Sequence, residues 1–412
     1  MNKANIKKNI IWNIVGTTLN AFNSLFFLII ATRINGVNDA GIFTFAFSTA
    51  TLFNIIGVYS GRVYQVTDQT DATDKDFIIS KILTCSIMLL VSILFVVINS
   101  YNIYKSLIIL LLCFLKMLEA FFETIYAIYQ KKEHLYNVGI SLTLKSVLNL
   151  ISFYILDKLT GNLVFSIIMM IIMYTIISII YDLPILKKTI SQNINWQKDR
   201  VYLILKSGFS AFIISFLTLY LINSSKYIID YLLLEKYQTI FGILLMPATV
   251  VLLFTQFLIN PFLTTITNCI QNNDYKALKR IILKFLGVIT IFGGFIILMA
   301  YFFGIPILEL IYEIQLSSYK IGFIVILVGA VLYGMSSILS NILIAMRHLN
   351  AQLIVYIAVS VIITIIEYFL IKKYGVIGAC YSYLIMTLII FLLFLLITFI
   401  FIRRDGEFNG KS

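Results

Sequence analysis

Long, nearly continuous apolar stretches separated by short polar segments dominate the sequence. Each stretch is close to the roughly 20 residues that an α-helix needs to cross a bilayer. Because the apolar residues are continuous rather than alternating, a transmembrane β-barrel is disfavoured. The pattern predicts membrane spans at 10–33, 40–62, 77–99, 106–130, 137–157 and 162–183, and again at 205–225, 237–261, 283–303, 321–345, 350–371 and 376–402. We expect no signal peptide, because the first apolar stretch is too long and no cleavage site follows it.

The composition strengthens this prediction. Apolar residues make up 60% of the 412 residues and charged residues only 12%, whereas a typical soluble domain has about 25% charged residues. These values exclude a soluble globular enzyme and a disordered chain. We therefore predict an all-α polytopic membrane protein with about 12 transmembrane helices.

The net charge of +12 would suit a nucleic-acid partner, but its distribution argues against one. Lysine and arginine lie mostly at the ends of the apolar stretches, where they set the orientation of the spans. Most of them fall on the cytoplasmic side when the N-terminus is placed in the cytoplasm. The sequence therefore predicts no nucleic-acid binding and two cytoplasmic termini.

The polar, basic segment between the sixth and seventh spans divides the chain in two. We predict an N-terminal six-helix lobe at 1–183, a cytoplasmic linker at 184–204, a C-terminal six-helix lobe at 205–402 and a cytoplasmic tail at 403–412. The segment 272–284 is predicted to be a short amphipathic basic stretch at the membrane surface. Since no soluble domain is expected, a substrate would have to bind within the helices.

A polar stripe runs along the first predicted span. Asn13, Thr17, Asn20 and Ser24 follow one another in steps of four, three and four, which places them on one face of a helix. Such a stripe either lines a cavity or holds two helices together. Both interpretations remain open at this point.

The fourth and fifth spans carry charged groups that are costly in hydrocarbon. Lys116, Glu119 and Glu123 share one helical face, and Lys145 and Asn149 share another. Glu123 and Lys145 lie at similar depths and could pair directly, while Lys116 could pair with Glu119 three residues on. The two lysines either face a substrate cavity or simply neutralise the glutamates.

Three further charged residues are candidates for function. Arg33 and Arg62 lie at span ends, where arginine either sets topology and contacts lipid headgroups or binds phosphate. Glu367 lies near the outer end of the eleventh span, where it could reach the membrane surface or serve as a proton or coupling-ion site. The cysteines and histidines lack metal-site spacing, so we expect no metal and no cofactor; they are Cys85, Cys113, Cys269, Cys380, His134 and His348.

Three segments resemble a known family. Ala31–Val63 is similar to a signature of the polysaccharide-exporter branch (Wzx-type repeat-unit flippases) of the MOP superfamily, which is related to MATE exporters and lipid II flippases. Asn341–Ile385 resembles the block that leads into the last span, and Leu258–Lys284 the turn after the eighth span and the basic segment beyond it. The matching positions are Arg33, Gly36, Gly41, Gly57, Arg62, Ala345, Tyr374, Gly375, Gly378 and Ala379. Ser210, and Lys372 or Lys373, stand where the family has proline.

The resemblance implies two six-helix lobes around a central cavity that opens alternately to each side. It implies a flippase, not an enzyme, that moves undecaprenyl-pyrophosphate-linked oligosaccharides from the inner to the outer leaflet of the bacterial cytoplasmic membrane. The product would be O-antigen, capsule or a teichoic-type polymer. Membrane lipids, a polysaccharide polymerase and chain-length machinery would be partners. The coupling ion, proton or sodium, stays open.

On this basis we expect a substrate cavity lined by Asn13, Thr17, Asn20, Ser24, Arg33, Arg62, Lys116, Lys145 and Asn149, with a charge network of Glu119, Glu123 and Glu367. The cations would supply part of a positive field for the pyrophosphate. Three alternatives are weighed. A MATE-like exporter of organic cations would need embedded acids to outweigh bases, and a membrane polysaccharide polymerase would show a large outer loop. A general solute carrier is the third.

Overall fold

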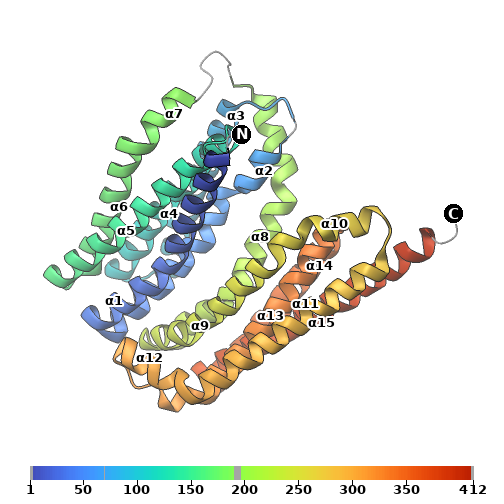
Figure 1. The fold of residues 1–412 in the computed structure, drawn as a ribbon. Coiled ribbons are helices and arrows are strands. Elements are labelled where there is room, and N and C mark those ends of the chain that lie inside the picture. The colour runs from blue at the N-terminus through green and yellow to red at the C-terminus, as the bar shows by residue number, and fades with distance from the viewer. Residues whose placement is uncertain (1–2, 69, 190–195, 410–412) are drawn as a thin grey trace. The chain divides into compact units, whose positions relative to one another are not determined.

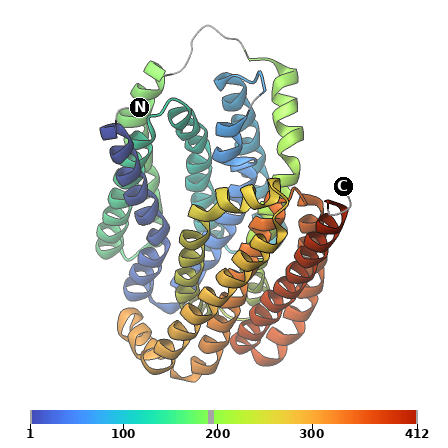
Figure 2. The same cartoon turned by 45° about the vertical axis from the view of Figure 1, so that its right-hand side comes forward.

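The computed structural model describes residues 3–68, 70–189 and 196–409, and every regular element in these ranges is a helix (Figure 1). The chain divides into two compact units, Met1–Phe216 and Leu217–Ser412. Within each unit the long helices run side by side, as Figure 2 also shows.

The first unit contains seven helices and the beginning of an eighth. They are α1 (Lys3–Val58), α2 (Gly61–Thr67), α3 (Asp74–Asn99), α4 (Ile103–Lys131), α5 (Leu135–Thr160), α6 (Leu163–Ile177) and α7 (Leu183–Thr189), followed by α8 (Lys198–Leu232). A π-helical turn, Ser178–Asp182, connects α6 to α7. α1 packs most extensively on α5.

The second unit begins within α8. Its further helices are α9 (Lys236–Ile259), α10 (Leu263–Gln271), α11 (Tyr275–Met299), α12 (Ile305–Tyr312), α13 (Lys320–Ala345), α14 (Leu349–Tyr374) and α15 (Val376–Asn409). Short 3₁₀ or π turns lie at Asn260–Phe262, Ala300–Gly304 and Ser317–Tyr319. α13 packs against α9, α11 and α15.

The helices account for all the predicted spans. Ten helices in the described ranges are long and apolar enough to cross a membrane. One of them, α1, has 56 residues and would be about 84 Å long as a single helix, far more than one bilayer needs. α4 has 29 residues but carries too many charges to be counted with the ten. Two spans in α1, together with α4, bring the number to about 12, so the predicted all-α multi-pass membrane protein is confirmed.

Gly36 divides α1 into its two spans. Its backbone is not helical, with φ of 82° and ψ of 176°. Residues that carry a Cβ atom rarely adopt this backbone conformation. The Asn35 amide beside it donates to the Asp157 carboxylate at 2.5 Å, which also accepts from the Ser166 hydroxyl at 3.1 Å. Asp157 thus ties the break to α5 and α6.

The segment 272–284 contains a short turn and the beginning of a long helix. Asn272 ends α10, and α11 already begins at Tyr275 and continues to Met299. The Asp274 side chain caps α11 by accepting from the Ala277 backbone amide at 2.9 Å, a strongly favoured way to start a helix. The basic residues of this segment therefore lie in the first turns of a long helix. Their position at the membrane surface stays a prediction.

The division into units falls inside α8. The first part of this helix packs with the N-terminal unit: the Tyr59 hydroxyl donates to the Leu205 carbonyl at 2.9 Å, and the Tyr59 ring stacks on Phe212. The lobe limits 1–183, 184–204, 205–402 and 403–412 stay predictions. Residues 190–195 of the proposed linker and 410–412 of the proposed tail lie outside the described residues.

Candidate functional site

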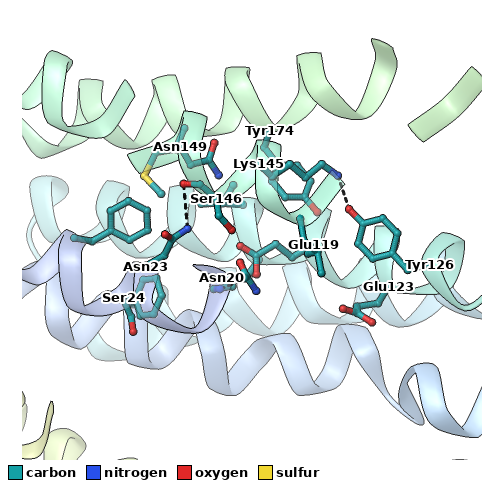
Figure 3. Close-up of a pocket in the computed structure, with 16 residues that line it drawn as sticks. Asn20, Asn23, Ser24, Glu119, Glu123, Tyr126, Lys145, Ser146, Asn149 and Tyr174 are labelled. Atoms are coloured by element: carbon teal, nitrogen blue, oxygen red, sulfur yellow. Dashed lines mark hydrogen bonds and ion pairs between the residues drawn. The ribbon is translucent and has the colours of Figure 1, made fainter. Parts of the chain in front are cut away.

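A polar cavity of about 60 Å³ lies among α1, α4, α5 and α6 of the N-terminal unit (Figure 3). Phe27, Phe47 and Met170 are among its apolar lining residues. Its polar lining residues are Asn20, Asn23, Ser24, Lys116, Glu119, Glu123, Tyr126, Lys145, Ser146, Asn149 and Tyr174. A polar lining inside a membrane-spanning unit is costly, which makes this cavity the leading candidate for a functional site.

Helical spacing explains how the polar residues converge. Positions three or four apart lie on one face of a helix, and each of α1, α4 and α5 turns such a face toward the cavity. α1 and α5 also approach very closely beside it, because a Cβ atom on Gly16 would lie only 2.4 Å from the Gly139 carbonyl oxygen. Two glycines facing each other are what allows the two backbones to touch.

The structure brings together seven of the twelve residues that the sequence analysis singled out. Those seven are Asn20, Ser24, Lys116, Glu119, Glu123, Lys145 and Asn149. The second half of the polar stripe on α1, Asn20 and Ser24, therefore lines the cavity. Whether these residues bind substrate stays a prediction.

The other five lie elsewhere. Asn13 and Thr17, the first half of the stripe, are not among the lining residues. The Thr17 hydroxyl donates to the Asn13 carbonyl of its own helix at 2.6 Å. Arg33 is exposed and is not among the lining residues. Arg62 pairs with Glu123 from outside the lining, and Glu367 belongs to the second unit.

The predicted pairing of Lys145 with Glu123 is wrong. The Lys145 ammonium lies 2.7 Å from the Asp182 carboxylate, a residue at the end of the π-helical turn. Glu123 instead lies 3.7 Å from the Arg62 guanidinium. Asp182 was missed because an aspartate at the end of a span normally faces water, whereas this one is fully buried.

The Lys145 ammonium is enclosed on several sides. It donates to the Tyr126 hydroxyl at 2.9 Å, as the dashed line in Figure 3 shows. The rings of Phe122 and Tyr174 lie 4.1 and 4.0 Å from it, which suits cation–π attraction. The Ser141 hydroxyl donates to Asp182 at 3.0 Å. The lysine is thus part of a closed, buried network.

Lys116 also has a counter-ion. Its ammonium lies 2.7 Å from the Glu119 carboxylate, three residues on along α4, which confirms the predicted pair. Both cations that line the cavity are therefore matched by carboxylates. Arg62, which was expected to add to the positive field, faces Glu123.

Glu367 does not reach the membrane surface, and that part of its prediction is wrong. Its side chain is 0% exposed, and the hydroxyls of Ser224 and Ser225 on α8 donate to its Oε1 atom at 2.8 and 2.7 Å. Its Oε2 atom has no hydrogen-bond partner in the described part of the chain. A role as a proton or coupling-ion site stays a prediction.

Comparison with known proteins places these features in a known fold. No protein-family model matches the chain. The capsular polysaccharide biosynthesis protein CapF of Staphylococcus aureus is 24% identical over 386 residues, which cover 90% of this chain and 94% of the relative.

Two solved structures are similar over nearly the whole chain. An inward-facing multidrug resistance MATE family transporter of the MOP superfamily has a TM-score of 0.68 at 13% identity, covering 96% of this chain and 99% of that one. A MOP superfamily transporter from Pyrococcus furiosus, described by a binding pocket of reverse polarity, has a TM-score of 0.65 at 13% identity, covering 99% and 96%. The protein is a multi-pass membrane protein with a fold shared with transporters of the MOP superfamily, and its sequence is similar to that of a capsular polysaccharide biosynthesis protein, as the resemblance predicted.

Proposed function

We propose that this protein is a flippase that moves undecaprenyl-pyrophosphate-linked oligosaccharides from the inner to the outer leaflet of the bacterial cytoplasmic membrane. The observation that carries the proposal is the similarity to a capsular polysaccharide protein over 90% of the chain, on a fold shared with transporters. Both termini would lie in the cytoplasm. A polysaccharide polymerase and chain-length machinery would receive the product.

The physical task fits the cavity. Moving a sugar hydroxyl from water into hydrocarbon without a new hydrogen bond costs several kcal/mol of free energy. Spontaneous flipping of an oligosaccharide is therefore very slow. Amide, hydroxyl and carboxylate side chains such as Asn20, Ser24 and Glu119 can replace the lost water. The task requires no bond to be made or broken, so we propose a transporter and not an enzyme.

Coupling of transport to a proton or cation gradient would use Glu367, the buried carboxylate of the second unit. We propose Glu367 for this role because its carboxylate is held by two serine hydroxyls on another helix, with one oxygen left without a partner in the described ranges. A single carboxylate in this position can take up a proton or a monovalent cation.

A second candidate function is an exporter of small organic cations. Two observations favour it: the fold is shared with multidrug transporters, and Glu119 and Glu123 are the most exposed charges of the cavity, with 28% and 33% of their side chains accessible. Carboxylates attract cations.

The test is deletion of the gene in its native host. We expect surface polysaccharide to disappear and lipid-linked oligosaccharide to accumulate on the cytoplasmic side, because the substrate would then lack a route across hydrocarbon. Re-expression of the wild-type chain should restore both, and the empty vector should restore neither. Unchanged polysaccharide together with greater sensitivity to organic cations would contradict the flippase and favour the second candidate.

A further inference from the structure

A pyrophosphate needs unpaired positive charge, and the lysines of the cavity do not offer it. Lys116 and Lys145 each have a carboxylate at 2.7 Å. The lysine side chains are only 14% and 3% accessible, whereas those of Glu119 and Glu123 are 28% and 33% accessible. Glu119 is paired with Lys116, Glu123 with Arg62, and Lys145 with Asp182. A polyanion entering this cavity would therefore find each lining cation already paired with a carboxylate.

The rest of the lining suits sugar hydroxyls. Asparagine amides and serine hydroxyls both donate and accept hydrogen bonds, and carboxylates accept them from hydroxyl groups. The Asn23 amide is already used, because it donates to the Ser146 carbonyl at 3.3 Å. Asn20 is exposed, and its side chain makes no hydrogen bond to another of the described residues.

Two buried polar atoms of α5 point to a missing partner. Asn149 and Ser146 both line the cavity and are at least nine-tenths buried. The Oδ1 atom of Asn149 and the Oγ atom of Ser146 have no hydrogen-bond partner among the described residues. Buried polar groups are normally hydrogen-bonded, so a hydroxyl-bearing ligand or water is expected beside them.

We propose that this cavity is a saccharide subsite, which takes the hydroxyl-bearing edge of a sugar residue and leaves the pyrophosphate outside. The inference rests on the proposed function and names the part of the substrate that the N-terminal unit recognises. A volume of about 60 Å³ corresponds to a few water positions, which matches one edge of a sugar ring and not a whole repeat unit. Tyr174 and Phe47 border the same space.

The test uses a cysteine as a reporter. Asn20→Cys is introduced in a Cys269→Ser background, because Cys85, Cys113 and Cys380 are buried. The rate of N-ethylmaleimide alkylation is measured in liposomes that carry either lipid-linked oligosaccharide from the deletion strain or undecaprenyl pyrophosphate without sugar. Asn99→Cys, at the exposed end of α3, is the matched control.

When the sugar-bearing lipid is present at about four times its Kd, about one fifth of the cavities are unoccupied. Because only these react, alkylation of the cysteine at position 20 should be about fivefold slower. The sugar-free lipid should leave the rate unchanged, as should both lipids at position 99. Adding Ser146→Ala should remove much of the protection. This change deletes a hydroxyl that has no partner in the described ranges, so the fold loses no hydrogen bond.

Equal protection by the sugar-free lipid would overturn the proposal and make the cavity a pyrophosphate site. Protection by neither lipid would also overturn it. In that case restoration of surface polysaccharide by the wild-type chain would show that the flippase stands and only the subsite has failed. Failure of the wild-type chain to restore surface polysaccharide in the deletion strain would count against the proposed function itself.

Discussion

Asp182→Ala is expected to destabilise the folded protein strongly. The change leaves the Lys145 ammonium, whose side chain is 3% accessible, without the carboxylate that lies 2.7 Å away. Breaking a buried ion pair by removing one partner costs about 3–5 kcal/mol, because the remaining charge is buried and uncompensated. That is a large share of the 5–15 kcal/mol or so that stabilises a typical domain. The measurement is the melting temperature of the purified protein in detergent, with an expected fall of about 10 °C.

A control and a rescue make this prediction specific. Lys116→Ala breaks a pair that is partly accessible, so it should cost only about 0.2–1 kcal/mol. Replacing both buried partners, as in Lys145→Met with Asp182→Leu, should recover much of the loss, since apolar pairs often substitute for buried ion pairs. An Asp182→Ala protein that melts at the wild-type temperature, or at no lower temperature than the Lys116→Ala protein, would contradict the buried network.

Gly139→Ala is expected to force α1 and α5 apart. A Cβ atom at this position would lie 2.2 Å from the backbone carbonyl of Trp12 and 2.6 Å from the backbone nitrogen of Asn13. Because these atoms are backbone, no side chain can move aside, and the whole helix has to shift. Overpacking of this kind costs about 1–3 kcal/mol and occasionally more. A lower melting temperature is the first expected result.

The same change should reach the cavity, since Asn20 lies on α1 and Asn149 on α5. Surface polysaccharide should therefore fall even where the variant is produced at the wild-type level. Gly287→Ala is the matched control: it also lies within a helix, and a Cβ atom there would meet nothing within 4 Å. Alanine should be neutral or stabilise α11 by up to about 1 kcal/mol. Equal melting temperatures and equal polysaccharide for the two variants would refute the close approach.

The spans could be predicted from the sequence because apolar length is a local property. The Lys116–Glu119 pair was predicted for the same reason, since the two residues lie one turn apart on a single helix. The boundary at Gly36 also follows from a polar interruption between two apolar stretches. The apolar pattern placed the start of the ninth span at residue 283, whereas the cap at Asp274 starts α11 before its apolar residues begin.

Contacts between helices were harder to predict, because they depend on how each helix is rotated. Lys145 was predicted to pair with Glu123 because the two lie at similar depths in the membrane. The π-helical turn at Ser178–Asp182 instead places the Asp182 carboxylate beside it. Glu367 was expected at the membrane surface from its position along the span, whereas its serine partners come from α8, more than 140 residues earlier. Neither partner carries a signal in the local sequence.

The central claim is tested most directly by flipping in a defined membrane. The purified protein is reconstituted into liposomes that contain lipid-linked oligosaccharide in both leaflets, and a membrane-impermeant oxidant of sugar diols is added outside. The account predicts that the inward-facing share of the sugar becomes oxidised in liposomes with protein and stays protected in protein-free liposomes. Equal protection of the inward-facing sugar in both, with folded protein present and an imposed proton or sodium gradient, would contradict it.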